Sequence, residues 1–363
     1  MNIEKKGARA IALYLPQYHP IPENDKWWGK GFTEWTNVGK AKPLFKGHYQ
    51  PRIPADLGYY DLRLPETREA QADMARKYGI EGFCYWHYWF GNGKRLLERP
   101  FNEVLNSGKP DFPFCLAWAN HSWKGIYLGV KSKESLIDQT YGGIPDYERH
   151  FYDVLPAFKD KRYINVNGKP FFMIFSPKEI PDPKEFISCW QSLAIKNGLS
   201  GIHFVAHSYL TEDIELYRKE GFDAINVVRL FDYQKRGISL YQKIKNKINR
   251  TILKKGFYYE YKDAMGYFSG EEDKEPYVYP TIIPNWDHSP RTGAYGSILK
   301  NSTPTFFRKH VKHVLENIKH KPHENQITII KSWNEWAEGN YLEPDLKYGT
   351  RFLEVLKEEF PNH

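Results

Sequence analysis

Two glutamates, Glu335 and Glu338, lie three residues apart in the segment SWNEWAEGNYLEPD, which follows the apolar run QITII. Cleavage or transfer of a glycosidic bond needs one carboxyl group that donates a proton to the leaving oxygen. It needs a second carboxyl group that steadies positive charge at the anomeric carbon, attacks that carbon or deprotonates a nucleophile. Two neighbouring carboxylates also raise the pKa of one of them, as a general acid at neutral pH requires. The pair is therefore a candidate catalytic site.

The residues around the glutamates suit the same chemistry. Asn334 can hydrogen bond a hydroxyl group, Trp336 offers a ring to the apolar face of a sugar, and Gly339 allows close approach of the backbone. A bare Glu-x-x-Glu pair is more often the solvated start of a helix, where the helix dipole favours acids. Two tryptophans, Trp333 just before the pair and Trp336 within it, favour the catalytic interpretation here.

Eight short apolar or aromatic runs alternate with amphipathic stretches along the chain. This order predicts an α/β fold, a single (β/α)8 barrel with elaborated loops after its strands and one domain over residues 1–363. The predicted strands lie at 10–15, 82–89, 112–120, 170–176, 201–208, 224–228, 278–287 and 326–336. The eighth is expected to end near Ser332. The alternative, a doubly wound open sheet, would carry a glycine-rich phosphate turn after an early strand, and FGNGKR lacks that spacing.

Polar and aromatic residues gather at the C-terminal ends of six predicted strands, where barrel enzymes build their sites. Any one of them could be a packed ring or a core histidine, but together they predict a cavity that holds a pyranose. We expect Glu335 and Glu338 to be catalytic. The predicted substrate-binding residues are Tyr14, Gln17, His19, Trp28, Tyr85, His87, Tyr88, Trp118, Asn120, Trp123, His207, Trp286, Asp287, Asn334 and Trp336.

Several segments resemble the WbsX family, namely YLPQYHPIPENDKWWGKGFTEWTNV, GIEGFCYWHYWFGNGKRLLERP, SGKPDFPFCLAWAN, FKDKRYINVNGKPFF and WNEWAEGNYLEPD. That family is described as glycosyltransferases of surface-polysaccharide clusters, and it resembles the glycoside hydrolase family 99 barrel of endo-α-mannosidases and mannanases. The resemblance covers nearly the whole chain. It implies a retaining enzyme that acts on an α-glycosidic bond of an O-antigen or capsule type polysaccharide.

The resemblance also implies a role for each glutamate. Glu335 would draw the proton from the sugar 2-hydroxyl, which closes onto the anomeric carbon as a 1,2-anhydro sugar. Glu338 would act first as general acid and then as base. One departure stands out, because the family pattern has an acidic residue after WAN, as in WANENW, whereas this chain has WANHSWKG with His121 and Ser122. If that position contacts sugar, the substrate of this chain differs from that of its relatives.

The choice between hydrolysis and transfer stays open at this point. The chain contains no Asp-x-Asp, the usual motif of a metal-dependent nucleotide-sugar site, and no metal or cofactor is expected. A barrel that binds glycan without catalysis is the alternative from another class.

The three cysteines Cys84, Cys115 and Cys189 are expected to be free thiols, and no apolar run reaches the length of a bilayer span. These features predict a cytoplasmic enzyme that acts on an oligosaccharide or a lipid-linked glycan.

The net charge of +8 comes from one segment. Eight Lys and Arg residues and no acid lie between Tyr233 and Tyr259, and the rest of the chain has equal numbers of basic and acidic residues. Because the basic residues are not interleaved with the aromatic ones, we expect no nucleic-acid partner. Over 240–252 an apolar residue recurs every four positions, which predicts a cationic amphipathic helix. Residues 235–255 therefore form either an ordinary barrel helix or a peripheral contact with an anionic inner membrane.

Overall fold

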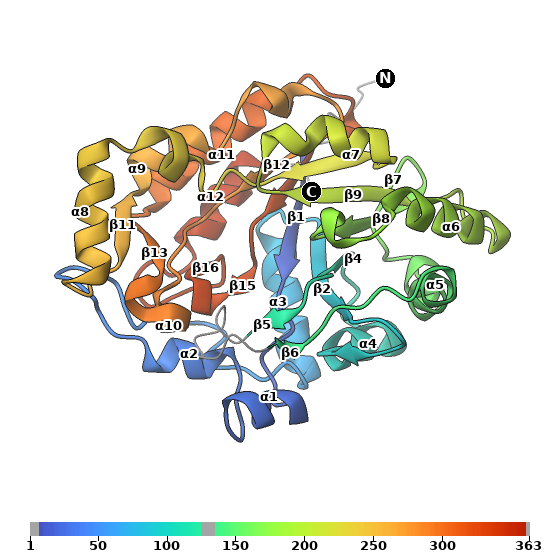
Figure 1. Ribbon diagram of the computed structural model, residues 1–363, viewed down its shortest axis with the longest axis horizontal. Coiled ribbons are helices and arrows are strands. Elements are labelled where there is room, and N and C mark those ends of the chain that lie inside the picture. The colour runs from blue at the N-terminus through green and yellow to red at the C-terminus, as the bar shows by residue number, and fades with distance from the viewer. Residues whose placement is uncertain (1–6, 125–134, 361–363) are drawn as a thin grey trace.

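The computed structural model describes residues 7–124 and 135–360 and shows a closed parallel barrel (Figure 1). Its strands are β1 (Arg9–Tyr14), β2 (Gly82–Trp89), β4 (Phe114–Trp118), β8 (Lys169–Ile174), β9 (His203–Ser208), β10 (Ala224–Val227), β12 (Val278–Ile282) and β14 (Ile327–Ile330). Each pairs in parallel with the next. The barrel closes because Ile11 of β1 lies opposite both Gly82 of β2 and Ile329 of β14. The expected (β/α)8 barrel is confirmed, and the open sheet is excluded.

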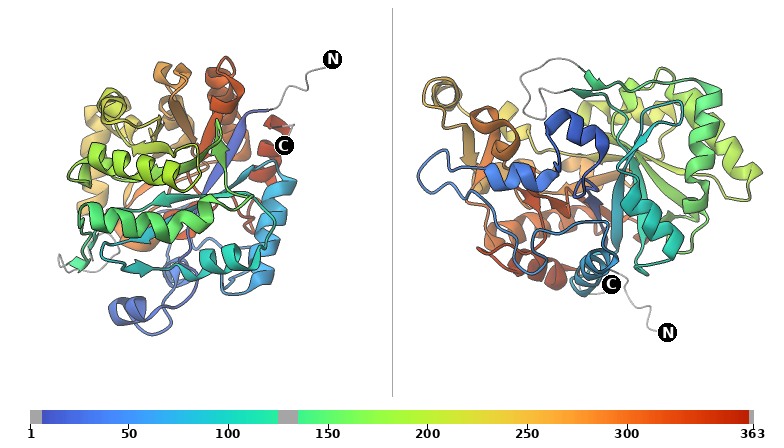
Figure 2. Two further views of the ribbon diagram at one scale, coloured as in Figure 1. Left: turned by 90° about the vertical axis from the view of Figure 1, so that its right-hand side faces the viewer. Right: turned by 90° about the horizontal axis from the view of Figure 1, so that it is seen from below.

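Helices cover the outside of the barrel between consecutive strands (Figures 1 and 2). They are α3 (Pro65–Lys77), α4 (Arg99–Ser107), α5 (Ile144–Phe158), α6 (Pro183–Lys196), α7 (Ile214–Glu220) and α11 (Pro304–Ile318), with α12 (Arg351–Glu359) after the last strand. Strand side chains that point outward meet these helices, as Phe172 of β8 meets Trp190 of α6 at 4.8 Å between ring centroids. Strands buried on both faces explain why the sequence shows continuous apolar runs rather than alternation.

The loops after the strands carry most of the remaining elements. After β1 come α1 (Pro22–Trp28) and α2 (Glu34–Lys40), after β2 comes β3 (Arg95–Leu96), and after β4 come β5 (Trp123–Lys124) and β6 (Ser135–Ile137). The loop after β10 holds α8 (Leu240–Thr251), β11 (Phe257–Glu260) and α9 (Tyr261–Ala264). The loop after β12 holds α10 (Ser289–Thr292) and β13 (Ser297–Lys300), and β15 (Asn334–Glu335) and β16 (Asn340–Tyr341) follow β14. A short strand β7 (Asn165–Val166) precedes β8.

The predicted strands all exist, but some of their predicted ends are wrong. The eighth strand ends at Ile330, near the expected Ser332, whereas β12 ends at Ile282 rather than at Asp287. In both places the buried chain continues past the last ladder pairing, so burial alone overestimates strand length. Side strands β11 and β13 pair in parallel and, with their loops, enclose a second apolar cluster beside the barrel.

Candidate active site

A cavity of about 380 Å³ opens at the carboxyl ends of the barrel strands. Its volume lies within the range of small-molecule sites. Both predicted catalytic residues line it, together with aromatic, cationic and neutral side chains. The lining residues are Leu15, Gln17, Trp86, Tyr88, Ala119, His121, Ser122, Trp123, Lys124, Phe175, Tyr209, Trp286, His288, Arg291, Lys331, Glu335 and Glu338.

The two glutamates occupy a tight hairpin beyond β14. Strand β15 pairs antiparallel with β16, so that Glu335 lies opposite Asn340, and a 3₁₀ turn over Trp336–Glu338 joins them. Gly339 closes the turn with a φ of +58°, a conformation that glycine adopts without strain. A Cβ atom on Gly339 would lie 2.6 Å from the Asp287 Cβ. The hairpin is therefore both short and closely packed against the loop after β12.

Asn334 and Trp336 hold this hairpin in place. The Asn334 side chain accepts a hydrogen bond from the Leu15 backbone N–H at 2.8 Å and donates to the Leu15 carbonyl at 3.0 Å. The Trp336 indole N–H donates to Glu343 Oε2 at 2.6 Å, and the ring stacks on Tyr341 at 3.7 Å. Both side chains are buried and neither lines the cavity. Both were predicted to contact sugar, but in the structure they hold the hairpin in place.

Two buried cations face the glutamates. Arg291 of α10 donates to Glu338 Oε1 at 2.5 Å and lies 3.7 Å from Glu335 Oε1 and 3.3 Å from Glu34 Oε2. Lys331 directly follows β14. Its ammonium group lies over the Trp286 ring, 5.7 Å from the ring centroid. Burial lowers the pKa of Lys331, but Tyr209 and the two glutamates outweigh burial and raise it, so the ammonium stays charged.

The environment gives the two carboxyl groups different proton affinities. Burial and the neighbouring Glu338 carboxylate raise the pKa of Glu335 well above its ordinary value. Burial also acts to raise the pKa of Glu338, but Arg291 and Lys331 outweigh it and hold that pKa below its ordinary value. One Glu335 oxygen, Oε2, is buried without a hydrogen-bond partner. The opposed pKa shifts favour the protonated form of Glu335 and the ionised form of Glu338.

Asp287 is buried behind the hairpin rather than in the cavity. Its carboxylate accepts hydrogen bonds from His48 Nε2 at 2.8 Å and Gln50 Nε2 at 2.7 Å, and Arg52 lies 3.8 Å away. Burial acts to raise the pKa of Asp287, yet His48 and Arg52 lower it to about 2. Its backbone N–H donates to the Glu338 carbonyl at 2.6 Å. Asp287 thus ties the residue 48–52 segment to the turn that carries Glu335 and Glu338.

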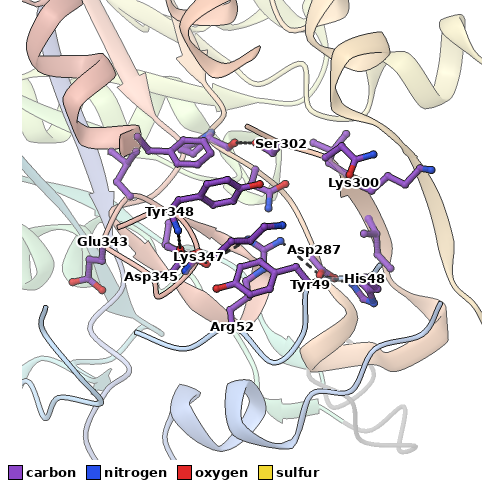
Figure 3. A pocket seen from close by; sticks show the side chains of 18 of the residues that line it. His48, Tyr49, Arg52, Asp287, Lys300, Ser302, Glu343, Asp345, Lys347 and Tyr348 are labelled. Carbon is purple, nitrogen blue, oxygen red and sulfur yellow. Dashed lines mark hydrogen bonds and ion pairs between the residues drawn. The ribbon is translucent and has the colours of Figure 1, made fainter. Parts of the chain in front are cut away.

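Figure 3 shows a second, smaller cavity beside Asp287. It has a volume of about 50 Å³ and is lined by residues of the 47–52 segment, of β13 and of the chain after β16. In this view His48 and Arg52 lie on opposite sides of Asp287. A cavity of this size has room for water but not for a sugar ring. Asp287 was predicted to bind sugar, but in the structure it anchors the 48–52 segment to the loop after β12.

Six of the predicted site residues come together on the large cavity: Gln17, Tyr88, Trp123, Trp286, Glu335 and Glu338. The Tyr88 and Trp123 rings meet edge to face at 5.2 Å, and Trp286 stacks on His288 at 5.7 Å. Tyr88, Trp123 and Trp286 thus give the wall flat apolar faces next to the two carboxyl groups. Such surfaces suit the apolar face of a pyranose.

The remaining predicted residues lie outside the cavity, largely because of strand parity. In β2, Trp86 and Tyr88 point inward, whereas Tyr85 packs on Phe101 of α4 and His87 Nε2 lies 2.8 Å from His150 Nε2 of α5. Successive side chains of a strand point to opposite faces, so adjacent residues cannot share one site. The predicted residues that the structure places away from the cavity are Tyr14, His19, Trp28, Tyr85, His87, Trp118, Asn120, His207, Asp287, Asn334 and Trp336.

Several of these residues support the loops instead. Tyr14 donates to Gln71 of α3 at 2.6 Å, and the Trp118 indole N–H donates to the Trp89 carbonyl at 2.9 Å. Asn120 accepts from the Ser176 backbone N–H at 2.7 Å. His207 lies beneath the cavity floor, where its ring stacks on Phe175 at 5.2 Å. Burial lowers the pKa of His207 to about 3, so its imidazole is neutral.

Sequence reasoning missed other lining residues, above all Arg291 and Lys331. Lys331 could have been found, because a lysine directly after a buried strand needs an anionic partner. Arg291 lies in a four-residue helix within a loop, and no periodic pattern marks it. His121 and Ser122, where the chain departs from the expected acidic motif, both line the cavity. Burial lowers the pKa of His121 to about 4, so a neutral imidazole stands where an acid was expected.

Comparisons with known proteins give matches over nearly the whole chain. A family model described as "Glycosyltransferase WbsX" matches residues 10–356. Two curated proteins of Xanthomonas campestris pv. campestris, from strains B100 and ATCC 33913, are each called "Uncharacterized protein WxcX" and are 34% identical to this chain over 360 and 361 residues. Each match covers 98% of this chain and 50% of the relative. The chain thus spans about half the length of the curated relatives it matches.

The barrel also superposes on solved structures. Two structures of the GH99 endo-α-mannosidase from Bacteroides thetaiotaomicron, one of them in complex with BIS-TRIS-propane, give TM-scores of 0.61 and 0.60 at 13% and 14% identity. Each superposition covers 97% of this chain and at least 96% of the mannosidase. A glycoside hydrolase-like protein gives a TM-score of 0.60 at 14% identity, over 98% of this chain and 94% of its own. At such identities the likeness establishes the fold.

Proposed function

This chain belongs to the WbsX glycosyltransferase family, and we propose that it is a carbohydrate-active enzyme that cleaves or transfers an α-glycosidic bond of a surface polysaccharide with retention. The observation that carries the proposal is the pair of buried carboxyl groups with opposite pKa shifts in an aromatic-walled cavity. Such a pair provides one proton donor and one proton acceptor at neutral pH. The polysaccharide and the linkage are part of the proposal, on the ground of the family.

In the proposed first step Glu335 accepts the proton of the sugar 2-hydroxyl, whose oxygen bonds to the anomeric carbon. The glycosidic C–O bond breaks as Glu338 donates its proton to the leaving oxygen. In the second step a water molecule or an acceptor hydroxyl loses its proton to Glu338 and opens the 1,2-anhydro ring. Glu335 then returns the proton to the 2-oxygen. Two displacements at one carbon give retention, and both carboxyl groups regain their starting states.

These roles need the shared proton on Glu338, whereas the opposed pKa shifts favour it on Glu335. We propose that the bound sugar moves it. A 2-hydroxyl that donates a hydrogen bond to Glu335 favours the ionised form of that carboxyl, and a glycosidic oxygen that accepts from Glu338 favours its protonated form. The pair titrates as a unit, so such contacts act on both carboxyl groups at once.

The acceptor decides between hydrolysis and transfer. We propose that the substrate is an oligosaccharide or a lipid-linked glycan met in the cytoplasm at the inner membrane. The cavity wall combines flat rings with the side chains of Gln17, His121 and Ser122, which suit sugar hydroxyl groups. Among the described lining residues the acids are Glu335 and Glu338, and three of the others are cations. A cavity of this kind accommodates neutral or acidic glycans.

The test is incubation with a panel of α-linked manno-, rhamno- and fucosyl oligosaccharides, with and without nucleotide sugars, analysed by mass spectrometry. Shortened products alone indicate hydrolysis, and lengthened products indicate transfer. Proton NMR of the first-formed product then reports whether the anomeric configuration is retained. The Glu338→Gln variant is the control for turnover. Binding of a panel glycan without any product, in wild type and variant alike, would contradict the proposal and support a glycan-binding barrel. Activity lost with a chelator and restored by Mn²⁺ would contradict the metal-free mechanism.

A further inference from the structure

Helix α8 presents its apolar side chains to solvent. Leu240 is 74% exposed and Ile252, at the helix end, is 70% exposed, while Ile244 and Ile248 are also exposed. At 100° per residue, these residues and Tyr241 fall within an arc of about 120°. An ordinary barrel helix buries such a stripe against the strands. The barrel-helix interpretation of residues 235–255 is therefore wrong, because the stripe faces away from the protein.

The side of α8 that faces the protein is polar. Asn246 and Asn249 are each only 5% exposed, and they lie opposite the apolar arc together with Gln242. Gln242 also completes a capping box with Ser239, whose Oγ accepts from the Gln242 N–H at 3.2 Å. Between this side and β11 lies a cavity of about 160 Å³. The helix is thus capped at its start, and its exposed apolar stripe lies outside the core.

Basic residues border the exposed stripe on both sides. Lys243, Lys247 and Arg250 fall along one edge of the arc and Lys245 along the other, and all four are exposed. The sequence from Tyr233 to Tyr259 contains no acid that could neutralise them. A stripe of aliphatic residues between rows of cations is typical of helices that lie at the surface of an anionic bilayer.

The surface continues beyond the end of the helix. Leu253 is exposed, and the Lys254 ammonium lies over the ring of the exposed Tyr295 at 5.8 Å from its centroid. Exposed apolar residues elsewhere, such as Ile195 on α6 and Leu216 on α7, are isolated on their helices. Contiguous exposed apolar residues mark interaction sites, whereas scattered ones are normal. We call the set from Leu240 to Lys255, with Tyr295, the α8 surface.

We propose that the α8 surface binds an anionic phospholipid bilayer, with α8 parallel to the membrane plane and its aliphatic side chains in the headgroup region. The charges select this occupant. A second copy of the chain would bring an identical cationic surface and be repelled, whereas an anionic headgroup layer neutralises both edges of the stripe. The contact is peripheral, since none of the described helices is long and apolar enough to cross a bilayer.

Figure 1 shows α8 at the flank of the barrel, on the side opposite α6. It runs roughly along the direction of β1, and from below it is seen end on at the edge of the molecule (Figure 2). The carboxyl ends of the strands, where the large cavity lies, therefore open along the membrane rather than into it. Membrane contact leaves the cavity open to glycan at the bilayer surface.

The test is flotation of the full chain with phosphatidylcholine vesicles and with vesicles that also contain phosphatidylglycerol. We expect flotation with the anionic vesicles at low salt, weaker flotation at high salt, and none with phosphatidylcholine alone. Replacing Lys243, Lys247 and Arg250 by Gln should lower the partition coefficient by about two orders of magnitude, at about fivefold for each charge. Ile244→Ser with Ile248→Ser should also weaken binding, because both side chains are expected to enter the headgroup region.

Helix α6 offers a matched control on the opposite flank. Lys184→Gln with Lys196→Gln, and separately Ile195→Ser, remove exposed groups of the same kinds and should leave flotation unchanged. Circular dichroism confirms that each variant is folded, and the assay needs no catalytic turnover, so its outcome is independent of the proposed enzyme activity. Wild type that stays with the soluble fraction beside anionic vesicles at low salt overturns the proposal. So does vesicle binding that depends on the lysines but not on Ile244 and Ile248, which would indicate electrostatic adsorption without entry of the aliphatic side chains into the headgroup region.

Discussion

The carboxyl groups of Glu335 and Glu338 differ in proton affinity because different atoms surround them. Glu338 receives a guanidinium hydrogen bond from Arg291, whereas Glu335 keeps one buried oxygen without a partner. Burial in a low-dielectric site disfavours the charged form of a carboxyl group, and it does so most for the group with fewer hydrogen bonds and cations nearby. Three residues of separation along the chain therefore produce two chemically distinct acids.

Glu335→Gln and Glu338→Gln are each expected to lower kcat by at least ~10²-fold, because glutamine keeps the size of the side chain but cannot exchange a proton. Both variants should fold, which circular dichroism checks. With an activated leaving group the Glu338→Gln variant should regain activity and Glu335→Gln should not, since departure then needs no acid. Rescue of Glu335→Gln instead would assign the acid role to the residue with the raised pKa.

Arg291→Gln should move the acidic limb of the pH profile of kcat/KM to higher pH. The Arg291 cation holds the pKa of Glu338 down, so its removal raises that pKa and protonates Glu338 at higher pH. Arg291→Lys keeps the charge and should leave the limb closer to that of wild type, with lower activity because the planar fork is lost. Arg63→Gln, at an exposed ion pair, is the control. A limb that stays in place in Arg291→Gln would show that another group controls it.

At the scale of elements, the hairpin of β15 and β16 positions the glutamates through its tight turn. Its geometry depends on Gly339, which combines a left-handed backbone with contact to Asp287. Gly349 offers a comparison on the same segment, because its φ is +54° but no atom lies within 4 Å of the position of its Cβ. Substitutions at these two glycines therefore distinguish the effect of backbone strain from the effect of steric contact.

Gly349→Ala should cost about 1 kcal/mol of unfolding free energy from the left-handed conformation alone and leave activity intact. Gly339→Ala carries the same strain and also drives a methyl group to 2.6 Å from the Asp287 Cβ, so the catalytic turn must move. We expect a larger loss of stability and at least tenfold lower kcat. Denaturant unfolding and steady-state kinetics of the two variants measure the difference, and equal behaviour would show that the turn tolerates the displacement.

The strands could be predicted because each is a buried apolar run that is visible in the sequence without knowledge of its neighbours. The direction of each side chain was harder to predict. Strand β2 is aromatic on both faces, so its sequence GFCYWHYW has no polar alternation to show that Tyr88 points inward and His87 outward. Gln17, Trp123 and Trp286 were found from their positions after strands. Arg291 was not, because its position depends on how an irregular loop folds back over the barrel.

At the scale of the whole molecule, Asp287 joins segments that are far apart in the sequence. Its folded pKa is about 2, below the value near 3.9 expected for an unfolded chain, so the ionised group stabilises the fold above about pH 4. This contribution, about 2 kcal/mol, is lost as pH falls through about 2. Asp287→Asn should therefore lower the unfolding free energy at neutral pH, and its deficit relative to wild type should shrink in acid. Urea unfolding across pH measures this, with the exposed Asp73→Asn as control. A deficit independent of pH would contradict it.

The closure of the barrel affects the order in which contacts form during folding. Leu15 and Asn334, which fasten the catalytic hairpin, are separated by 319 positions, and the His48–Asp287 pair by 239. Contacts of such separation form late, because the entropy of closing the intervening chain opposes them. During synthesis the pair of carboxyl groups is complete only after the last barrel strand is made, so we expect no activity from a growing chain before that point. In refolding, helical circular dichroism should return before activity does.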